Sequence, residues 1–323
     1  MKDFQDIHNL IADDMQEIDS LILKKLSSDV VLINQIANYI ISAKGKRLRP
    51  MLLILVTKAL NYKGSFNHTL AIVIELIHTA TLLHDDVVDK SKLRRSRKTA
   101  NELWGNAAAV LVGDFLYSRS FEMMVEPKSM KIMEIMAKAT NTIAKGEVMQ
   151  LLNIQNYEIN EKEYLKVIRR KTACLFQAAA RVGAVLTKVD AKTENNFKKY
   201  GLYLGCAFQI IDDILDYKAD SQDLGKQLGD DLAEGKATLP IIYALQKANK
   251  TEKEILKNAI RNSDNNDFAK IVNILEDLKA FDYTFKIAEN FANKAKLCLN
   301  NVPNSNYKQA LIKLTDLSLQ RKK

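Results

Sequence analysis

Apolar residues recur at helical spacing along almost the whole chain. They mark one amphipathic helix from Ile7 to Leu21 and a second from Val31 to Ile40, because positions three and four apart share a helix face. The same pattern predicts helices over about 50–60, 67–89, 100–124, 129–153, 161–187 and 192–218, and shorter ones from about 237 to 321. The sequence therefore predicts an all-α fold.

Breaks in this pattern are few. They are a basic turn at 44–47, a basic loop at 90–98, a charged glycine-containing segment at 221–236, and asparagine-rich breaks at 262–266 and 300–303. Only 4 Pro and 11 Gly occur in 323 residues, and no stretch resembles an interdomain linker. We therefore expect residues 1–323 to form a single-domain bundle of long helices.

Composition narrows the class of protein further. A chain that is 47% hydrophobic and 27% charged can bury a core, which excludes a disordered protein. Its 3 Cys show no CxxC spacing, so a disulfide framework or zinc site is not indicated. The polar, acidic start does not match a signal peptide, and the longest apolar stretch, 70–83, is shorter than a membrane span. The expected location is the cytoplasm.

Two helices that are apolar on nearly every side run into clusters of acids, and both clusters read DDxxD. On a helix, residues i and i+4 share a face, so Asp85 with Asp89, and Asp212 with Asp216, can bind one ion while the middle aspartate points away. Carboxylates offered from one side suit Mg²⁺ with water and phosphate oxygens as further ligands. A solvated helix end is the simpler explanation for one such motif, but a poor one for two.

Basic residues accompany these acids. Arg side chains bind phosphate oxygens in a fork, whereas Lys acts as a mobile point charge. The cations are Lys46 and Arg49 in a basic turn, Arg94 and Arg95 after the first motif, Lys171 beside Thr172, and Lys226 and Lys236 in a glycine-containing loop. Any one run alone is typical of a solvated surface, but together with the acids they predict a pocket for a metal and a diphosphate. The net charge of +9 could suggest nucleic acid, but the acid clusters would repel its phosphates, so no nucleic-acid partner is expected.

Five segments in order then resemble the trans-prenyl diphosphate synthases. They are GKRLRP at 45–50, ELIHTATLLHDDVVDKSKLRR at 75–95, KTA at 171–173, GCAFQIIDDILDY at 205–217 and GKQLGDDLAEGKATLP at 225–240. The resemblance implies the isoprenoid synthase fold, an all-α homodimer with a central cavity. It also implies an enzyme that joins isopentenyl diphosphate to an allylic diphosphate, with farnesyl diphosphate as the expected primer and about three Mg²⁺ ions.

The resemblance also implies roles for individual residues. Metal ligands would be Asp85, Asp89, Asp212 and Asp216; allylic diphosphate ligands Arg94, Lys171, Thr172, Gln209, Lys226 and Lys236; and isopentenyl diphosphate ligands Lys46, Arg49, His78 and Arg95. Asp85, Asp89, Asp212, Lys171 and Lys226 are the expected catalytic residues. Ionisation of the allylic C–O bond needs a neutralised leaving group and a dry cavity. The four histidines offer no obvious protein base, and the resemblance gives the final proton to the released diphosphate.

Product length should depend on what blocks the cavity beneath the first acids. Ala80 and Thr81, one turn before Asp85, are small and favour growth past geranylgeranyl length. The segment resembles octaprenyl-type synthases of quinone side chains, with Phe121 and Met124 on the next helix as candidate floor residues. A short-chain geranylgeranyl or farnesyl diphosphate synthase and a noncatalytic subunit of a heteromeric synthase remain alternatives. The basic end at 321–323 is expected to allow transient contact with an anionic membrane surface, where a long apolar product must go.

Overall fold

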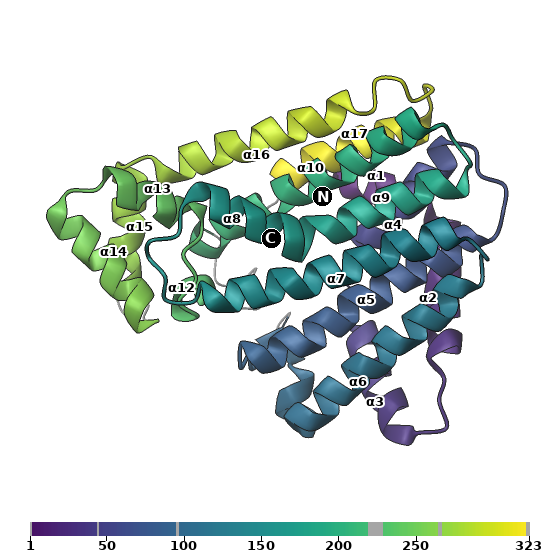
Figure 1. Cartoon of the computed structure of the whole chain (residues 1–323), viewed down its shortest axis with the longest axis horizontal. Helices are drawn as coiled ribbons and strands as arrows, with labels where there is room; N and C mark the ends of the chain where they lie inside the picture. Colours follow the sequence, from purple (N-terminus) through teal and green to yellow (C-terminus); the bar gives the residue numbers. More distant parts are fainter. Residues whose placement is uncertain (1, 44, 95–96, 219–228, 264–266, 321–323) are drawn as a thin grey trace. The chain divides into compact units, whose positions relative to one another are not determined.

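The computed structural model describes residues 2–43, 45–94, 97–218, 229–263 and 267–320 (Figure 1). These residues are almost entirely helical, which confirms the predicted all-α class. Within these ranges the strands are β1 (Leu93–Arg94) and β2 (Arg97–Lys98), which pair antiparallel inside the basic loop.

The helices follow the predicted segments closely. They are α1 (Lys2–Leu10), α2 (Ala12–Leu26), α3 (Val31–Ser42), α4 (Leu48–Ala59), α5 (Phe66–Val88), α6 (Ala100–Val125), α7 (Met130–Leu152), α8 (Glu161–Ile168), α9 (Cys174–Leu186), α10 (Ala191–Lys218), α12 (Asp230–Ala233), α13 (Leu239–Lys247), α14 (Lys250–Asn262), α15 (Phe268–Asp277), α16 (Ala280–Leu297) and α17 (Asn306–Leu319). A π-helical turn, η1 (Arg169–Ala173), joins α8 to α9. The sequence pattern predicted one continuous helix there and another across the α1–α2 break.

The chain divides into two compact units, each built from segments that are distant in sequence. Unit 1 comprises residues 1–140, 175–201 and 298–314, and unit 2 comprises 141–174, 202–297 and 315–323. The single domain expected from the sequence stays a prediction.

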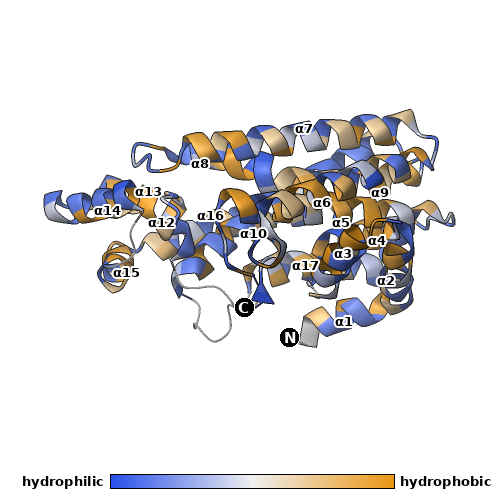
Figure 2. Ribbon diagram, turned by 90° about the horizontal axis from the view of Figure 1, so that it is seen from below, coloured by the Kyte–Doolittle hydropathy of each residue, from blue (hydrophilic) through white to orange (hydrophobic). Residues whose placement is uncertain are grey.

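Unit 1 is organised around α4 and α5. Residues 51–56 of α4 are completely buried, and so are 71–74 and 76–77 of α5. Figure 2 accordingly shows both helices with extensive hydrophobic colouring. Helix α5 packs against α4 on one side and along α6 on another, so the first acidic motif extends from a rigid core helix.

By length and composition α5 could also cross a membrane. However, 61% of its most apolar window is buried in the structure, as is common for the core helix of a soluble protein.

Helix α6 contains a kink that the hydrophobic pattern did not predict. Gly105 has φ 82° and ψ 160°, which interrupts the helix within its first two turns. A positive φ of this kind is strained for residues with a Cβ and accessible to glycine. The kink separates the beginning of α6 from its long part beside α5.

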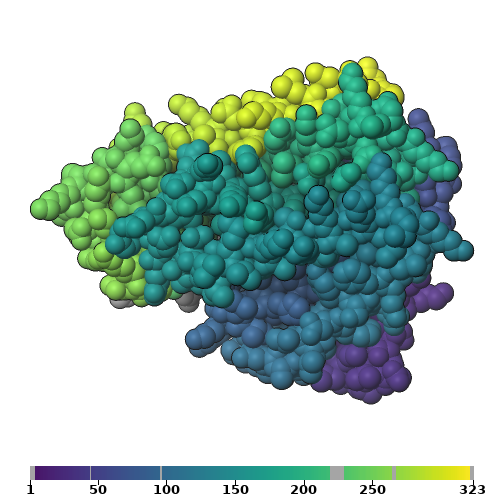
Figure 3. Space-filling model, viewed as in Figure 1, coloured from purple at the N-terminus to yellow at the C-terminus, as the bar shows by residue number. Residues whose placement is uncertain are grey.

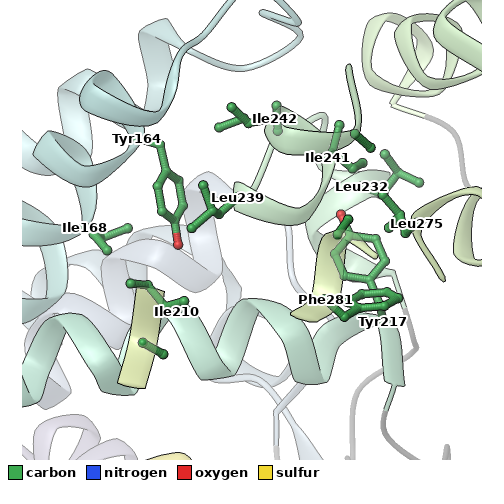
Figure 4. Packing of buried hydrophobic residues seen from close by; sticks show 14 of the residues in the cluster. Tyr164, Ile168, Ile210, Tyr217, Leu232, Leu239, Ile241, Ile242, Leu275 and Phe281 are labelled. Carbon is green, nitrogen blue, oxygen red and sulfur yellow. The ribbon is translucent and has the colours of Figure 1, made fainter. Parts of the chain in front are cut away.

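Unit 2 has its own hydrophobic core, formed by α8, the second half of α10 and the helices from α12 to α16. Figure 4 shows how its aromatic and branched side chains interleave between these helices. Tyr217 stacks on Phe268 with ring centroids 6.0 Å apart, and Tyr243 stacks on Tyr283 at 4.1 Å. This core fixes the part of α10 that carries the second acidic motif.

Candidate active site

The first acidic motif lies at the end of α5 in unit 1. Its middle residue, Asp86, is only 4% exposed and accepts a fork of hydrogen bonds from Arg94. The Nε and Nη2 atoms of Arg94 lie 2.9 and 2.7 Å from Oδ1 of Asp86. Asp85 and Asp89 are half-buried. Asp86 is therefore buried and bound by Arg94, whereas Asp85 and Asp89 are more exposed to solvent.

The end of α5 is held against α6 by His84, which the sequence left without an assigned role. Its Nε2 atom lies 3.2 Å from the carbonyl oxygen of Val110 and 3.4 Å from a carboxylate oxygen of Asp114. The ring occupies space left by Gly113, where a Cβ would approach Nε2 to 2.3 Å. These contacts hold His84, the residue directly before Asp85, against α6 in unit 1.

The second acidic motif lies on α10 in unit 2 and repeats this arrangement with different partners. Asp213, the middle residue, is 3% exposed. The Tyr164 hydroxyl donates to one of its oxygens, and the Gln209 amide donates to the other at 2.8 Å. In Figure 4 the Tyr164 oxygen points toward the helix that carries Ile210. Asp212 and Asp216 are half-buried, like the outer pair of the first motif.

Burial dominates the electrostatics of this middle carboxyl. It raises the pKa of Asp213 well above the ordinary value, and the nearby Asp231 raises that pKa further, against the opposing hydrogen bonds from Tyr164 and Gln209. The pKa of Tyr164 is also raised, first by burial and then by Asp213. Tyr164 therefore stays protonated and remains a hydrogen-bond donor.

A chain of hydrogen bonds connects the second motif to Thr172. The Thr172 hydroxyl donates to the Gln209 side-chain oxygen at 2.8 Å, and the Gln209 amide nitrogen donates to Asp213. Thr172 lies in the π-helical turn η1, a local geometry that is frequent at functional sites. The structure therefore brings together the predicted pair of Thr172 and Gln209.

The π-helical turn lies very close to α7. A Cβ at Gly146 would lie 2.6 Å from the backbone nitrogen of Lys171 and 2.9 Å from the carbonyl carbon of Arg170. Only a residue without a side chain allows this approach, because backbone atoms cannot rotate away. Gly146 thus determines how near Lys171 lies to the polar face of α7.

Two predicted phosphate-binding lysines point into the same region of unit 2. Lys171 forms an ion pair with Glu147 at 2.6 Å, and Lys236 forms one with Glu234. The surroundings orient the Gln150 amide with its oxygen toward both ammonium groups, at 3.2 Å from Lys171 and 3.1 Å from Lys236. The structure thus brings Lys171 and Lys236 to a common acceptor.

A cavity of about 150 Å³ adjoins these side chains. Both polar and apolar groups line it, from α7, α8, η1, α10, α12 and the segments before α8 and α13. The lining residues are Gln150, Asn153, Ile159, Tyr164, Val167, Ile168, Lys171, Thr172, Gln209, Asp213, Asp231, Lys236, Ala237 and Thr238. Its lining includes two acids, Asp213 and Asp231, as well as the two lysines, so a small anionic group would bind at the lysine side.

Asp216 is positioned by the segment that follows the second motif. The backbone N–H of Asp231 donates to a carboxylate oxygen of Asp216 at 3.1 Å, and the N–H of Gly229 donates to the Asp216 carbonyl at 2.9 Å. These bonds tie α12 to the end of α10 within unit 2.

The residues predicted to bind isopentenyl diphosphate lie on packed elements of unit 1. Arg49 is in the first turn of α4, with its guanidinium carbon 4.5 Å from the centroid of the Phe176 ring. Lys46 is exposed just before that helix, and His78 is half-buried on α5. Their assignment to this substrate stays a prediction. Two further predicted ligands lie outside the described residues: Arg95, for isopentenyl diphosphate, and Lys226, for the allylic diphosphate.

The candidate chain-length residues lie on α5 and α6, which pack together. Ala80 is completely buried, and the Thr81 hydroxyl donates to the His78 carbonyl at 2.7 Å. On α6, Met124 is fully buried and Phe121 lies 5.4 Å from the Tyr117 ring. Their role in product length is still a prediction.

Sequence reasoning missed Tyr164, Glu147, Gln150 and Glu234. Tyr164 resembled an ordinary core aromatic, and its polar role depends on a partner 49 residues away. The spacing of Glu147 and Gln150, three apart on one helix, was a usable signal, because such residues share a face.

The donor set can be tested for a divalent metal. In the part of the chain that the structure describes, no three His, Cys, Asp or Glu side chains gather closely enough to hold a metal ion alone. A pair of half-buried carboxylates at each motif fits Mg²⁺, which commonly takes one or two protein carboxylates and completes its shell with water and substrate phosphate. The donor chemistry therefore fits, and the outer aspartates are the candidate ligands because they are less buried than Asp86 and Asp213 and share a helix face.

A family model, two related sequences and a solved structure that match this chain are all those of polyprenyl synthases. Residues 30–278 match the family described as "Polyprenyl synthetase". The chain is 45% identical over 316 residues to octaprenyl diphosphate synthase of Escherichia coli (strain K12), covering 98% of each chain. It is 40% identical to all-trans-nonaprenyl-diphosphate synthase (geranyl-diphosphate specific) of Rhodobacter capsulatus, again over 98% of each chain. Among solved structures, a polyprenyl synthase from Caulobacter crescentus CB15, complexed with calcium and isoprenyl diphosphate, matches with a TM-score of 0.96 and 41% identity, covering 99% of this chain and 98% of that one.

Proposed function

Because the chain belongs to the polyprenyl synthetase family, we propose that it is a trans-prenyltransferase that elongates an allylic diphosphate with isopentenyl diphosphate. The product is a long all-trans polyprenyl diphosphate, of octaprenyl length for a quinone side chain. The observation that carries this proposal is the 45% identity to an octaprenyl diphosphate synthase over 98% of both chains. The primer is farnesyl diphosphate.

The residues of unit 2 support binding of a diphosphate. Lys171 and Lys236 converge on Gln150 beside a cavity of about 150 Å³, and Thr172 is fixed by Gln209. The two ammonium groups can bind the oxygens of a leaving group whose negative charge grows as the allylic C–O bond breaks, and the Thr172 hydroxyl can join them when its single proton turns from Gln209 to a diphosphate oxygen. The site thereby favours the transition state over the bound substrate.

The outer carboxylates would hold Mg²⁺, at Asp85 and Asp89 in unit 1 and at Asp212 and Asp216 in unit 2. When bound, the metal neutralises charge on the diphosphate. Asp86 and Asp213 instead position their motifs through Arg94 and Tyr164. Arg49, Lys46 and His78 bind isopentenyl diphosphate, and the released diphosphate takes the proton lost after addition.

A product-length assay tests this proposal. Purified protein receives Mg²⁺, labelled isopentenyl diphosphate and farnesyl diphosphate, and the dephosphorylated prenols are separated by chromatography. An octaprenyl product supports the proposal. A product that stops at geranylgeranyl length supports the short-chain alternative, and no product with any primer supports a noncatalytic subunit.

Substitutions in the two motifs test the metal assignment. Asp85→Ala and Asp212→Ala should each lower turnover by orders of magnitude and leave the helical fold intact, because half-buried like charges are removed. Full activity in either variant would contradict the assignment. Circular dichroism of both variants provides the control for folding.

The assembly is a homodimer in the cytoplasm. Helix α6 exposes Leu103, Val110 and Leu111, and the last turns of α7 expose Val148, Leu151 and Leu152. Figure 3 shows α7, coloured teal, open on the viewed face. Exposed apolar faces of this kind are typical of subunit interfaces. Light scattering after size exclusion that gives a monomer mass would contradict the dimer.

A further inference from the structure

The two lysines that the proposed function assigns to the diphosphate each have a glutamate partner. Glu147 lies 2.6 Å from the Lys171 ammonium nitrogen, and Glu234 pairs with the Lys236 ammonium. All four side chains belong to unit 2, and the exposed fractions of the lysines are only 20% and 15%. Both pairs are therefore better shielded from water than a typical surface ion pair.

The pairs are also arranged around one neutral residue. Gln150 lies one helical turn after Glu147 on α7, and its oxygen accepts from both lysines at 3.2 and 3.1 Å. Each ammonium group thus contacts a glutamate carboxylate as well as the shared amide oxygen. A neutral acceptor holds the two cations close together without neutralising them, whereas each glutamate removes one positive charge from the site.

We infer that Glu147 and Glu234 act as internal counter-ions, which occupy the lysines in the free enzyme and are displaced when a diphosphate binds. This inference rests on the proposed function, in which Lys171 and Lys236 bind the diphosphate. The two glutamates are positioning residues, since they act through the lysines. By competing for the ammonium groups, they lower the affinity of the site for any diphosphate.

This competition costs both kinds of diphosphate the same binding free energy, but it leaves them with different affinities. The prenyl diphosphate also buries an apolar tail, which contributes binding free energy independent of the lysines. Inorganic diphosphate, released in every addition, is held by charge and hydrogen bonds alone. The counter-ions therefore keep inorganic diphosphate weakly bound and favour its release between successive additions.

The test measures binding of inorganic diphosphate to the full-length protein by titration calorimetry in the presence of Mg²⁺. Glu147→Gln and Glu234→Gln keep the size of each side chain and remove its charge. Each variant should bind inorganic diphosphate about threefold to tenfold more tightly, the range expected for loss of a partly shielded ion pair. The inhibition constant for added diphosphate in the elongation assay should fall by the same factor.

Matched variants separate this effect from a general change of charge or fold. Glu289→Gln removes the same charge from an exposed position of α16 and should leave the affinity unchanged. Glu147→Asp keeps the charge and should remain near the wild type. A merely structural role for the glutamates would weaken diphosphate binding and would not tighten it.

The outcomes distinguish this inference from the proposed function. Unchanged or weaker diphosphate binding in both glutamine variants overturns the inference, provided that Lys171→Ala and Lys236→Ala still lose affinity. If the two lysine variants bind diphosphate as the wild type does, the proposed diphosphate site itself is wrong. Tighter binding in the glutamine variants, with no change in Glu289→Gln, supports the counter-ion role.

Discussion

The close approach of α7 to the π-helical turn predicts an unusual effect of Gly146→Ala. Alanine in a helix is ordinarily more stable than glycine by up to about 1 kcal/mol. Here the added Cβ would lie 2.6 Å from the Lys171 backbone nitrogen, whereas ordinary contact begins at 3.4 Å. The two backbones must therefore separate by about 0.8 Å, the difference between those distances.

This separation should reduce both stability and activity. Overpacking of a buried site costs about 1–3 kcal/mol, which outweighs the gain in helix propensity. Because Lys171 and Thr172 move with the turn, kcat/KM for the allylic substrate should fall by about 100-fold, as for other misplacements near 1 Å. Steady-state elongation with labelled isopentenyl diphosphate measures kcat/KM, and thermal unfolding measures the loss of stability.

Gly183→Ala is the matched control. Its Cβ would lie 3.0 Å from a side-chain carbon of Val56, so it overpacks a helix contact in unit 1 without touching a predicted site residue. It should lower the melting temperature slightly and leave kcat/KM near the wild type. If Gly146→Ala is as active as Gly183→Ala, the glycine does not position Lys171 and the reasoning fails.

Three further predictions concern other parts of the chain. Tyr164→Phe should lower the free energy of unfolding by about 1–3 kcal/mol in chemical denaturation, because it leaves a buried Asp213 oxygen without its donor; an unchanged value would show that this bond contributes nothing net. Ala80→Phe should shorten the prenol product in chromatography, and an unchanged product length would place the growing chain elsewhere. For Asp14, burial raises the pKa, but hydrogen bonds from His68 and Lys58 outweigh it and hold the pKa below 3.8. Its contribution to stability is therefore present above pH 3.8 and lost as pH falls through the lower folded-state pKa, so denaturation curves of the wild type and Asp14→Asn should converge in acid.

The helices were predictable because their cause is local. Periodic apolar residues specify which face is buried, and the long segments predicted at 67–89 and 192–218 match the observed helices within a few residues. The Gly105 kink was not predictable from this pattern, because the apolar spacing continues across it. The π-helical turn packs closely against Gly146, which lies 25 residues before Lys171 in the sequence, and the local apolar pattern does not predict this contact.

The parts of the candidate site that follow from residue type and local spacing were predictable from the sequence. The DDxxD spacing indicated that the outer aspartates share a face, and the structure shows both middle aspartates with other partners. Those partners were not predictable, because Arg94 was assigned to substrate and Tyr164 to no function. Likewise, a glutamate near a lysine in sequence is common, and only tertiary structure shows that Glu147 and Glu234 meet the two lysines of one cavity.

The π-helical turn also affects how this segment can change during evolution. Such a turn holds one residue more than the same stretch of α-helix, so α8 and α9 keep their buried faces while Lys171 and Thr172 are displaced from regular positions. Deleting one residue there would restore a regular helix, leave the buried faces of α8 and α9 in register, and return the remaining residues of the turn to regular helical positions. Insertions and deletions at 169–173 should therefore switch substrate binding on or off, whereas point substitutions at the same positions adjust it by degrees.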